Sequence, residues 1–261
     1  MTEANDGKGE LRRFFIKEIE ARDGFCRITG SEARHITKAL RMGRGDRIIL
    51  MDGKGGRFLA IVESTGGQEV LVALERSLPQ PPPSPVEITL CQALLKSHSM
   101  DMVVEKTSEL GVCRIFPFSS ARTVVRLDER RFAHKARRWR EIGHCATKQS
   151  DRRTPPEIGP LLLFGDLVAR WQKEKALKVI FWEEEGEKHL KGLLRASFPV
   201  KKVIGIVGPE GGFTREEIWT ARGAGFTSIS LGQRVLRAET AAITTVAIVQ
   251  YEWGDLTLNN L

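Results

Sequence analysis

The chain has 261 residues, of which 41% are hydrophobic and 28% charged, and this composition excludes a wholly disordered protein. Its 41 lysines and arginines outnumber its 33 acidic residues; the net charge of +8 favours a polyanionic partner. No apolar run reaches the ~18 residues that span a bilayer, the N-terminus lacks the apolar core of a signal peptide, and the four cysteines form no C-x-x-C pair. We therefore expect a reduced, cytoplasmic, globular protein without membrane contact, disulfide scaffold or zinc ribbon.

Residues 11–76 have the pattern of a small β domain, and residues 1–10 are expected to form a flexible tail. Short apolar runs occur at residues 47–51, 58–62 and 70–74. Turn signals separate them at residues 52–56 and 64–67. A short helix is expected over residues 31–41, with Ser31 as its N-cap. The glycine-rich residues 52–56 lack the spacing of a phosphate-binding loop and lie between two strands, so we interpret them as a hairpin turn.

A proline-rich stretch follows at residues 77–85, which contain five of the 11 prolines. Such a run cannot supply the backbone hydrogen bonds of a helix or a central strand, and it favours an extended spacer. We interpret it as a linker between two domains; a loop within one domain is the alternative.

Beyond residue 85, strands alternate with helices. Near-continuous apolar strands are predicted at residues 86–91, 114–116, 178–182, 203–207 and 228–231. Helices are predicted at residues 98–110 and about 128–149. This alternation predicts a parallel sheet with helices on both faces, an α/β domain over residues 86–261.

The first chemical signal is the glycine-rich loop Gly208-Pro-Glu-Gly-Gly212, which directly follows the buried strand 203–207. Thr214 can cap the following helix. In an open α/β sheet, ligands bind beyond the carboxyl ends of the strands, so this loop is a candidate ligand site. A tight structural turn is the alternative. Glu210 opposes a bound anion and better suits a cationic or hydrogen-bonding ligand.

A second loop of this kind follows the strand at 228–231. It carries Arg234 and Arg237, and Glu239 then begins a helix that is apolar almost all round. Such a helix must be buried on most sides, inside the domain or against another subunit. The arginines are candidates for substrate chemistry, although a structural ion pair, for instance with Glu239, would also explain them.

The third signal is charge. Residues 122–153 contain 11 lysines and arginines against four acidic residues, and their apolar residues recur at helical spacing. A solvated helix face is the ordinary interpretation. The charge is nearly that of the whole chain, so we expect phosphate contacts, with basic residues of the N-terminal domain, including Arg44, completing a two-part clamp on a polyanion.

The two loop motifs, Gly-Pro-Glu-Gly-Gly-Phe at 208–213 and Leu-Gly-x-Arg-Val-Leu-Arg-x-Glu-Thr-Ala at 231–241, resemble the signature of RsmE-type methyltransferases of the SPOUT superfamily. Members methylate N3 of a uridine in small-subunit (16S) ribosomal RNA. The resemblance extends over nearly the whole chain, including Lys96-Ser97 and Glu109-Leu-Gly-Val112. The family usually has Glu before Gln149-Ser150, where this chain has Lys148.

The resemblance implies a PUA-like β-barrel joined to a SPOUT domain with a C-terminal trefoil knot, a homodimer packed through the knot, and S-adenosylmethionine as cofactor. Three strand-end loops would hold this cofactor. The expected binding residues are Glu183, Gly208, Pro209, Glu210, Gly211, Gly212, Leu231, Gly232, Leu236, Arg237 and Thr240.

Uridine N3 carries a proton and becomes nucleophilic as that proton leaves. We therefore expect Arg234 and Arg237 to stabilise the developing anion and Glu239 to orient one of them, with Glu210 as a weaker candidate base. We expect no metal, and we interpret His35, His98 and His144 as structural or RNA-facing residues. The expected contacts to ribosomal RNA are Arg12, Arg13, Lys38, Arg41, Lys96, Arg122, Arg138 and Arg152.

Three alternatives remain open from the sequence. The first is a SPOUT enzyme that methylates a ribose 2′-hydroxyl, and the second is a non-catalytic RNA-binding factor for ribosome assembly. The third, an enzyme acting on nucleotide phosphates, is disfavoured by Glu210 and by the lack of a Walker pattern.

Overall fold

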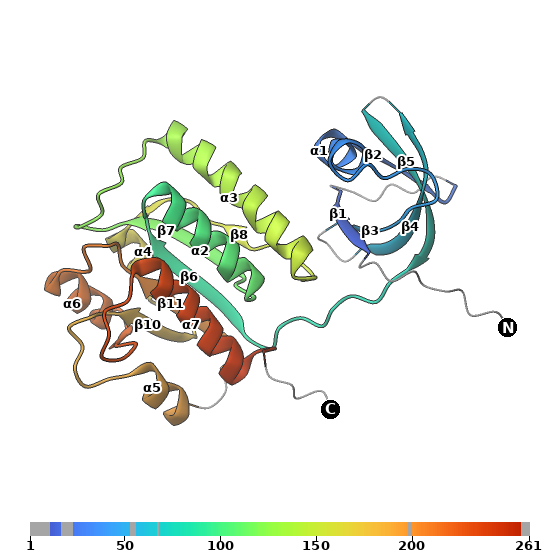
Figure 1. Cartoon of the computed structure of the whole chain (residues 1–261). Helices are drawn as coiled ribbons and strands as arrows, with labels where there is room; N and C mark the ends of the chain where they lie inside the picture. Colours follow the sequence, from blue (N-terminus) through green and yellow to red (C-terminus); the bar gives the residue numbers. More distant parts are fainter. Residues whose placement is uncertain (1–10, 17–22, 53–55, 67, 198–199, 257–261) are drawn as a thin grey trace. The chain divides into compact units, whose positions relative to one another are not determined.

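The structure is a computed structural model that describes residues 11–16, 23–52, 56–66, 68–197 and 200–256 of the chain. The chain divides into two compact units, Met1–Pro82 and Pro83–Leu261. Figure 1 labels most of the helices and strands of each unit. The expected tail at residues 1–10 lies outside the described residues.

The N-terminal unit is built on a five-stranded sheet in the order β1-β3-β4-β5-β2. β1 pairs with β3 in parallel, and the other pairs are antiparallel. β3 and β4 follow each other in the chain and pair antiparallel, and the Gly56 amide donates to Oδ1 of Asp52 over 2.8 Å. The glycine-rich residues 53–55 between them, part of the expected turn, lie outside the described residues. The strands are β1 (Arg12–Phe15), β2 (Phe25–Thr29), β3 (Arg47–Met51), β4 (Arg57–Gly66) and β5 (Glu69–Ser77).

The predicted short helix consists of α1 (Gly30–Arg34) and a π-helical turn, η1 (His35–Ala39). The prediction of Ser31 as N-cap is wrong: Thr29 occupies that position, with an extended backbone and no side-chain capping bond. The helix begins one residue earlier because Gly30, with φ +71°, turns the chain directly out of β2.

The C-terminal unit contains a seven-stranded sheet in which all paired strands are parallel, as predicted. The order is β12-β10-β11-β6-β7-β8, and β9 pairs with β7. The strands are β6 (Glu87–Ala93), β7 (Arg114–Ser119), β8 (Glu157–Ile158), β9 (Leu162–Leu163), β10 (Leu177–Phe181), β11 (Lys202–Val207) and β12 (Thr227–Ile229).

Helices cover both faces of this sheet because its strands present apolar side chains to both sides (Figure 1). On β11, Val203 and Val207 join one core, and Ile204 and Ile206 join the other. The first core contains residues of α2 (Ser97–Glu109), α3 (Glu129–Gln149), α5 (Leu190–Ala196) and α7 (Ala238–Trp253). The second contains residues of α4 (Phe164–Trp171) and α6 (Arg215–Gly223).

The apolar helix after the second loop is α7. It buries Ala242, Val246 and Val249, while Ile243 is only partly buried and Tyr251 is 65% exposed. The trefoil knot and the covering of this helix by a second subunit stay predictions. No helix in the described part of the chain combines the length and the apolar character required to cross a bilayer.

Candidate functional site

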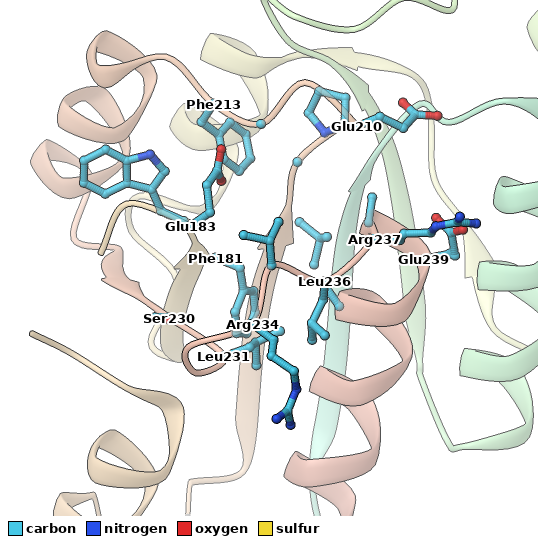
Figure 2. A pocket seen from close by; sticks show the side chains of 18 of the residues that line it. Phe181, Glu183, Glu210, Phe213, Ser230, Leu231, Arg234, Leu236, Arg237 and Glu239 are labelled. Atoms are coloured by element: carbon cyan, nitrogen blue, oxygen red, sulfur yellow. The ribbon is translucent and has the colours of Figure 1, made fainter. Parts of the chain in front are cut away.

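The carboxyl ends of three neighbouring strands, β12, β10 and β11, form one edge of the parallel sheet. The loops that follow them line a single cavity of ≈ 550 Å³ (Figure 2). Lys96 and Ser99 at the start of α2 complete its wall together with the first residues of α7. The two loops singled out by sequence therefore face the same space, as predicted.

The loop after β11 is shaped by its glycines. The Gly212 amide donates to the carbonyl of Pro209 over 3.0 Å, and Gly212 has φ +69°, a conformation that favours glycine. A Cβ at Gly212 would overlap the carboxylate of Glu183, and one at Gly208 would lie 2.9 Å from the ring of Phe213. Both glycines thus allow close packing of the loop against neighbouring side chains.

A capping box fixes the end of this loop. The Glu217 amide donates to Oγ1 of Thr214 over 3.2 Å, and the Thr214 amide donates to Oε2 of Glu217 over 2.9 Å. The predicted role of Thr214 as N-cap of the following helix, α6, is confirmed.

Glu185 anchors the loop after β10 to neighbouring parts of the fold. This buried carboxylate accepts hydrogen bonds from the Ser228 hydroxyl on β12 and from Nη2 of Arg222 on α6. Burial favours a higher pKa for Glu185, but the bonds from Ser228, the Glu187 amide and Arg222 outweigh it, and the pKa of this carboxyl is lowered. Glu185 therefore remains charged and joins the loop to two neighbouring elements.

The sequence analysis missed this network. Glu185 is the third of three consecutive glutamates, and nothing in the spacing of Arg222 and Ser228 distinguishes them from surface residues. Trp182 was also missed, although it lines the cavity and lies 5.8 Å below the guanidinium of Arg222.

The loop after β12 turns at Ser230 and Gly232. The Ser230 hydroxyl accepts the Gly232 amide at 3.1 Å, and Gly232 has φ +120°. Arg237 is the N-cap residue of α7 and makes no side-chain capping bond. In Figure 2 the side chain of Arg234 extends away from those of Arg237 and Glu210.

The three residues expected to take part in the chemistry, Arg234, Arg237 and Glu239, all line the cavity. Across the described ranges, Glu239 forms no ion pair with either arginine. The roles assigned to these residues stay predictions.

Most of the expected cofactor residues face the cavity, with two exceptions. Glu183, Gly208, Pro209, Glu210, Gly212, Leu231, Gly232, Leu236 and Arg237 line it. Thr240 is exposed on α7 outside this lining, and Gly211 faces Arg122 instead, whose Nη1 donates to the Gly211 carbonyl over 3.0 Å. Phe181, Phe213 and Ser230 add apolar and hydroxyl groups that the loop motifs did not indicate.

The expected RNA contacts fall into both units. In the N-terminal unit Arg12, Lys38 and Arg41 are exposed, and Arg13 is partly buried. Of the expected contacts in the C-terminal unit, Lys96, Arg122 and Arg138 are exposed.

Arg138 and Arg152, like Arg122, have partners within the fold. Arg138 lies 2.9 Å from the carboxylate of Asp101. Arg152 is partly buried, and its Nη1 donates to the carbonyls of Ser108 and Val112 over 2.6 and 3.2 Å. Because burial disfavours its charge, the pKa of Arg152 is lowered. The guanidinium of Arg152 therefore serves the packing of α2 against its neighbours.

The predicted basic helix is α3, and it is amphipathic. Its buried side comprises Ala136, Trp139, Gly143, Ala146 and Thr147, and Asp128 caps its N-terminus by accepting the Arg131 amide over 2.8 Å. Its outer side exposes Arg130, Arg137 and Arg140.

Two family models match the chain, one for each unit. An RNA methyltransferase domain matches residues 82–250, and an RNA methyltransferase PUA domain matches residues 28–75. Among curated proteins, the ribosomal RNA small subunit methyltransferase E of Bacillus subtilis is 29% identical over 93% of this chain and 97% of its own length. The protein of the same name from Rickettsia conorii is 31% identical over 92% of this chain and 96% of its own.

Solved structures agree with these matches. A ribosomal RNA small subunit methyltransferase E from Neisseria gonorrhoeae bound to S-adenosylmethionine superimposes with a TM-score of 0.85 at 31% identity, covering 95% of this chain and all of that chain. A Legionella pneumophila protein described as a methyltransferase in complex with S-adenosylmethionine superimposes with a TM-score of 0.86 at 33% identity, with the same coverage. The chain, an α/β SPOUT-type domain preceded by a PUA-like domain, therefore belongs to the family of ribosomal RNA small subunit methyltransferases E.

Proposed function

We propose that this protein transfers a methyl group from S-adenosylmethionine to N3 of a uridine in small-subunit ribosomal RNA. The observation that carries this proposal is the convergence of three strand-end loops on one cavity, with Arg237 and Glu239 among the residues that line it. The family relationship supports it, because relatives with the same two domains have been solved with this cofactor bound.

The residues of the cavity fit the cofactor. Its volume of ≈ 550 Å³ lies within the range of small-molecule sites. Phe181, Trp182 and Phe213 provide apolar and aromatic surface for an adenine ring, and the exposed carboxylate of Glu183 can accept hydrogen bonds from ribose hydroxyls. The glycines of the loop after β11 leave backbone groups accessible for the polar parts of the ligand.

The protein must supply alignment and charge stabilisation. When bound, S-adenosylmethionine supplies a methyl group that its sulfonium has already activated. Arg237, with Arg234, would stabilise the negative charge that develops on the uracil ring as N3 loses its proton. Glu239 would orient one of these cations. Glu210, whose Oε1 lies 3.4 Å from the Lys96 amide, is the weaker candidate to accept the proton.

The RNA would be held by both units. We infer that residues 11–76 form a PUA-like RNA-binding domain, that residues 77–85 are a linker, and that residues 86–261 form the methyltransferase domain. The proposed contacts are Arg12, Arg13, Lys38, Arg41, Lys96, Arg122 and Arg138, together with the outer face of α3; Arg152 would support them from within the fold.

The remaining expectations concern assembly and location. The partly buried Ile243 and the exposed Tyr251 on α7 support a homodimer packed through this helix and the predicted knot. Because its proposed substrate is ribosomal RNA, we infer that the protein works in the cytoplasm.

A direct assay tests the function. Small subunits from a strain lacking the enzyme are incubated with the purified protein and labelled S-adenosylmethionine, and the RNA is digested to nucleosides and compared by mass spectrometry with standards. Label in N3-methyluridine is the expected result. Label in a 2′-O-methyl nucleoside would overturn the assigned atom, and no incorporation together with no cofactor binding by calorimetry would overturn the enzymatic proposal.

A further inference from the structure

Arg122 and Gly211 are in contact, although the sequence analysis assigns Arg122 to RNA binding and Gly211 to cofactor binding. Arg122 follows β7 and leads toward the basic helix α3, while Gly211 belongs to the glycine-rich loop of the cofactor cavity. Nη1 of Arg122 donates to the Gly211 carbonyl over 3.0 Å. A Cβ at Gly211 would lie 3.1 Å from Cβ of Arg122, so the two residues also pack closely.

A second bond joins the same two segments. The amide of Ala121 donates to Oε1 of Glu217 over 2.8 Å. The other carboxylate oxygen of Glu217 accepts the Thr214 amide within the capping box that ends the glycine-rich loop. The segment after β7 is therefore attached to this loop at Gly211 and to the helix start that follows it.

We propose that Arg122 is a positioning residue that couples RNA bound along α3 to the cofactor loop 208–212. The inference rests on the proposed function, because it assumes that the cavity binds S-adenosylmethionine and that α3 contacts RNA. Arg122 acts through Gly211; it is outside the residues that line the cavity.

The chemistry of the guanidinium permits this double role. It carries five N–H donors, and the bond to Gly211 uses one of them. The side chain is exposed, so the remaining donors are accessible to a phosphate. A phosphate held there restricts the rotamers of Arg122, which restrains the loop that must be ordered when the cofactor binds.

Coupling between two binding sites is reciprocal, so RNA should raise the affinity for the cofactor by the factor with which the cofactor raises the affinity for RNA. In the unsubstituted protein we expect RNA to raise the affinity for the cofactor about fivefold, at the lower end of typical allosteric coupling. Arg122→Lys keeps the charge but loses the planar arrangement of donors, so it should reduce this factor to about one.

The experiment measures binding of labelled S-adenosylhomocysteine, the demethylated form of the cofactor, by equilibrium dialysis with and without purified small subunits. The unsubstituted protein and Arg122→Lys are compared with Arg195→Lys, a matched change at an exposed residue of α5. Arg195→Lys should retain the coupling. If small subunits leave the affinity of the unsubstituted protein unchanged, or if Arg122→Lys retains the full factor, the inference is wrong.

A second variant approaches the same contact from the loop. Gly211→Ala places a methyl group against Cβ of Arg122, whereas Gly192→Ala on α5 meets no atom within 4 Å. Gly211→Ala should lose the coupling and Gly192→Ala should keep it; equal coupling in both would contradict the proposal. Failure of the unsubstituted protein to bind S-adenosylhomocysteine at all would instead count against the proposed function.

Discussion

Arg222 on α6 places its Nη2 2.8 Å from Oε2 of Glu185 in the loop after β10. The same carboxylate accepts the hydroxyl of Ser228 on β12, and the Trp182 amide donates to the carbonyl of Ile229 over 3.0 Å. These bonds join the loop after β10 to α6 and to β12, the strand that leads into the loop carrying Arg234. Two of the three loops that line the cavity are therefore joined by bonds that lie within the fold.

Glu185→Gln should lower the free energy of unfolding. The substitution removes a charged acceptor from a buried network, which costs about 1–3 kcal/mol. Urea denaturation at pH 7 measures the loss. Glu184→Gln is the matched control, because Glu184 pairs with Arg215 at the surface and exposed pairs contribute only about 0.2–1 kcal/mol. Equal losses in the two variants would contradict the importance of the buried network.

The contribution of Glu185 should depend on pH with a defined sign. Its pKa is lower in the folded protein than the ordinary value of 4.5, so its stabilising effect is complete above that value and disappears as the pH falls through the folded pKa. The difference in Tm between the unsubstituted protein and Glu185→Gln should be constant from pH 7 to about pH 5 and shrink below pH 4.5. A difference that persists undiminished at pH 3 would show that the charge of Glu185 is not responsible.

Arg237→Ala should separate catalysis from cofactor binding. If Arg237 stabilises the charge that develops on uracil, its loss lowers kcat by about 10²–10³, the effect of removing one preorganised donor. Most groups around the cavity remain, so the Kd for S-adenosylmethionine should change much less. Single-turnover methylation of small subunits and calorimetry measure the two quantities. Near-normal turnover with cofactor binding intact would remove Arg237 from the mechanism.

Local patterns predicted the framework of this site, while the contacts that brace it depend on tertiary structure. β11, the glycine-rich loop and the Thr214 cap were predictable because strand periodicity, turn residues and capping boxes are short-range features. Glu185, Arg222 and Ser228 meet only because the sheet order places β12 beside β10. No spacing in the chain encodes that order.

The same limit explains Gly211. The loop motif assigns residues 208–212 to the cofactor as a group, but the direction in which each residue faces is decided by what packs against it. For Gly211 the neighbour is Arg122, 89 residues away in sequence. Basic composition likewise placed Arg152 with the RNA contacts, although its guanidinium is engaged by the carbonyls of Ser108 and Val112.

Arg152→Met should therefore act mainly on stability. Its loss leaves two carbonyl oxygens without their donor in a partly buried region, at a cost of about 1–3 kcal/mol. Arg153→Met, a change at the exposed neighbouring residue, should leave the free energy of unfolding within about 0.5 kcal/mol of the original. Chemical denaturation of both variants measures this contrast. If Arg152→Met were as stable as the unsubstituted protein but bound RNA more weakly, Arg152 would be an RNA contact after all.

The outer face of α3 should show its role in the salt dependence of RNA binding. Arg130 and Arg137 are exposed on this face, seven residues apart, which places them on the same side of the helix. Each cation that contacts a phosphate contributes ~0.7–0.9 to the slope of log K against log salt concentration, because it releases a bound counterion. Arg130→Gln and Arg137→Gln should each reduce the slope by that amount, and the double variant by about twice as much. Arg195→Gln on α5 controls for the loss of one positive charge from the protein, since a general effect of net charge would change all three single variants alike. Filter binding of small subunits between low and physiological salt measures the slopes, and slopes that stay equal would show that this face of α3 is only a solvated surface.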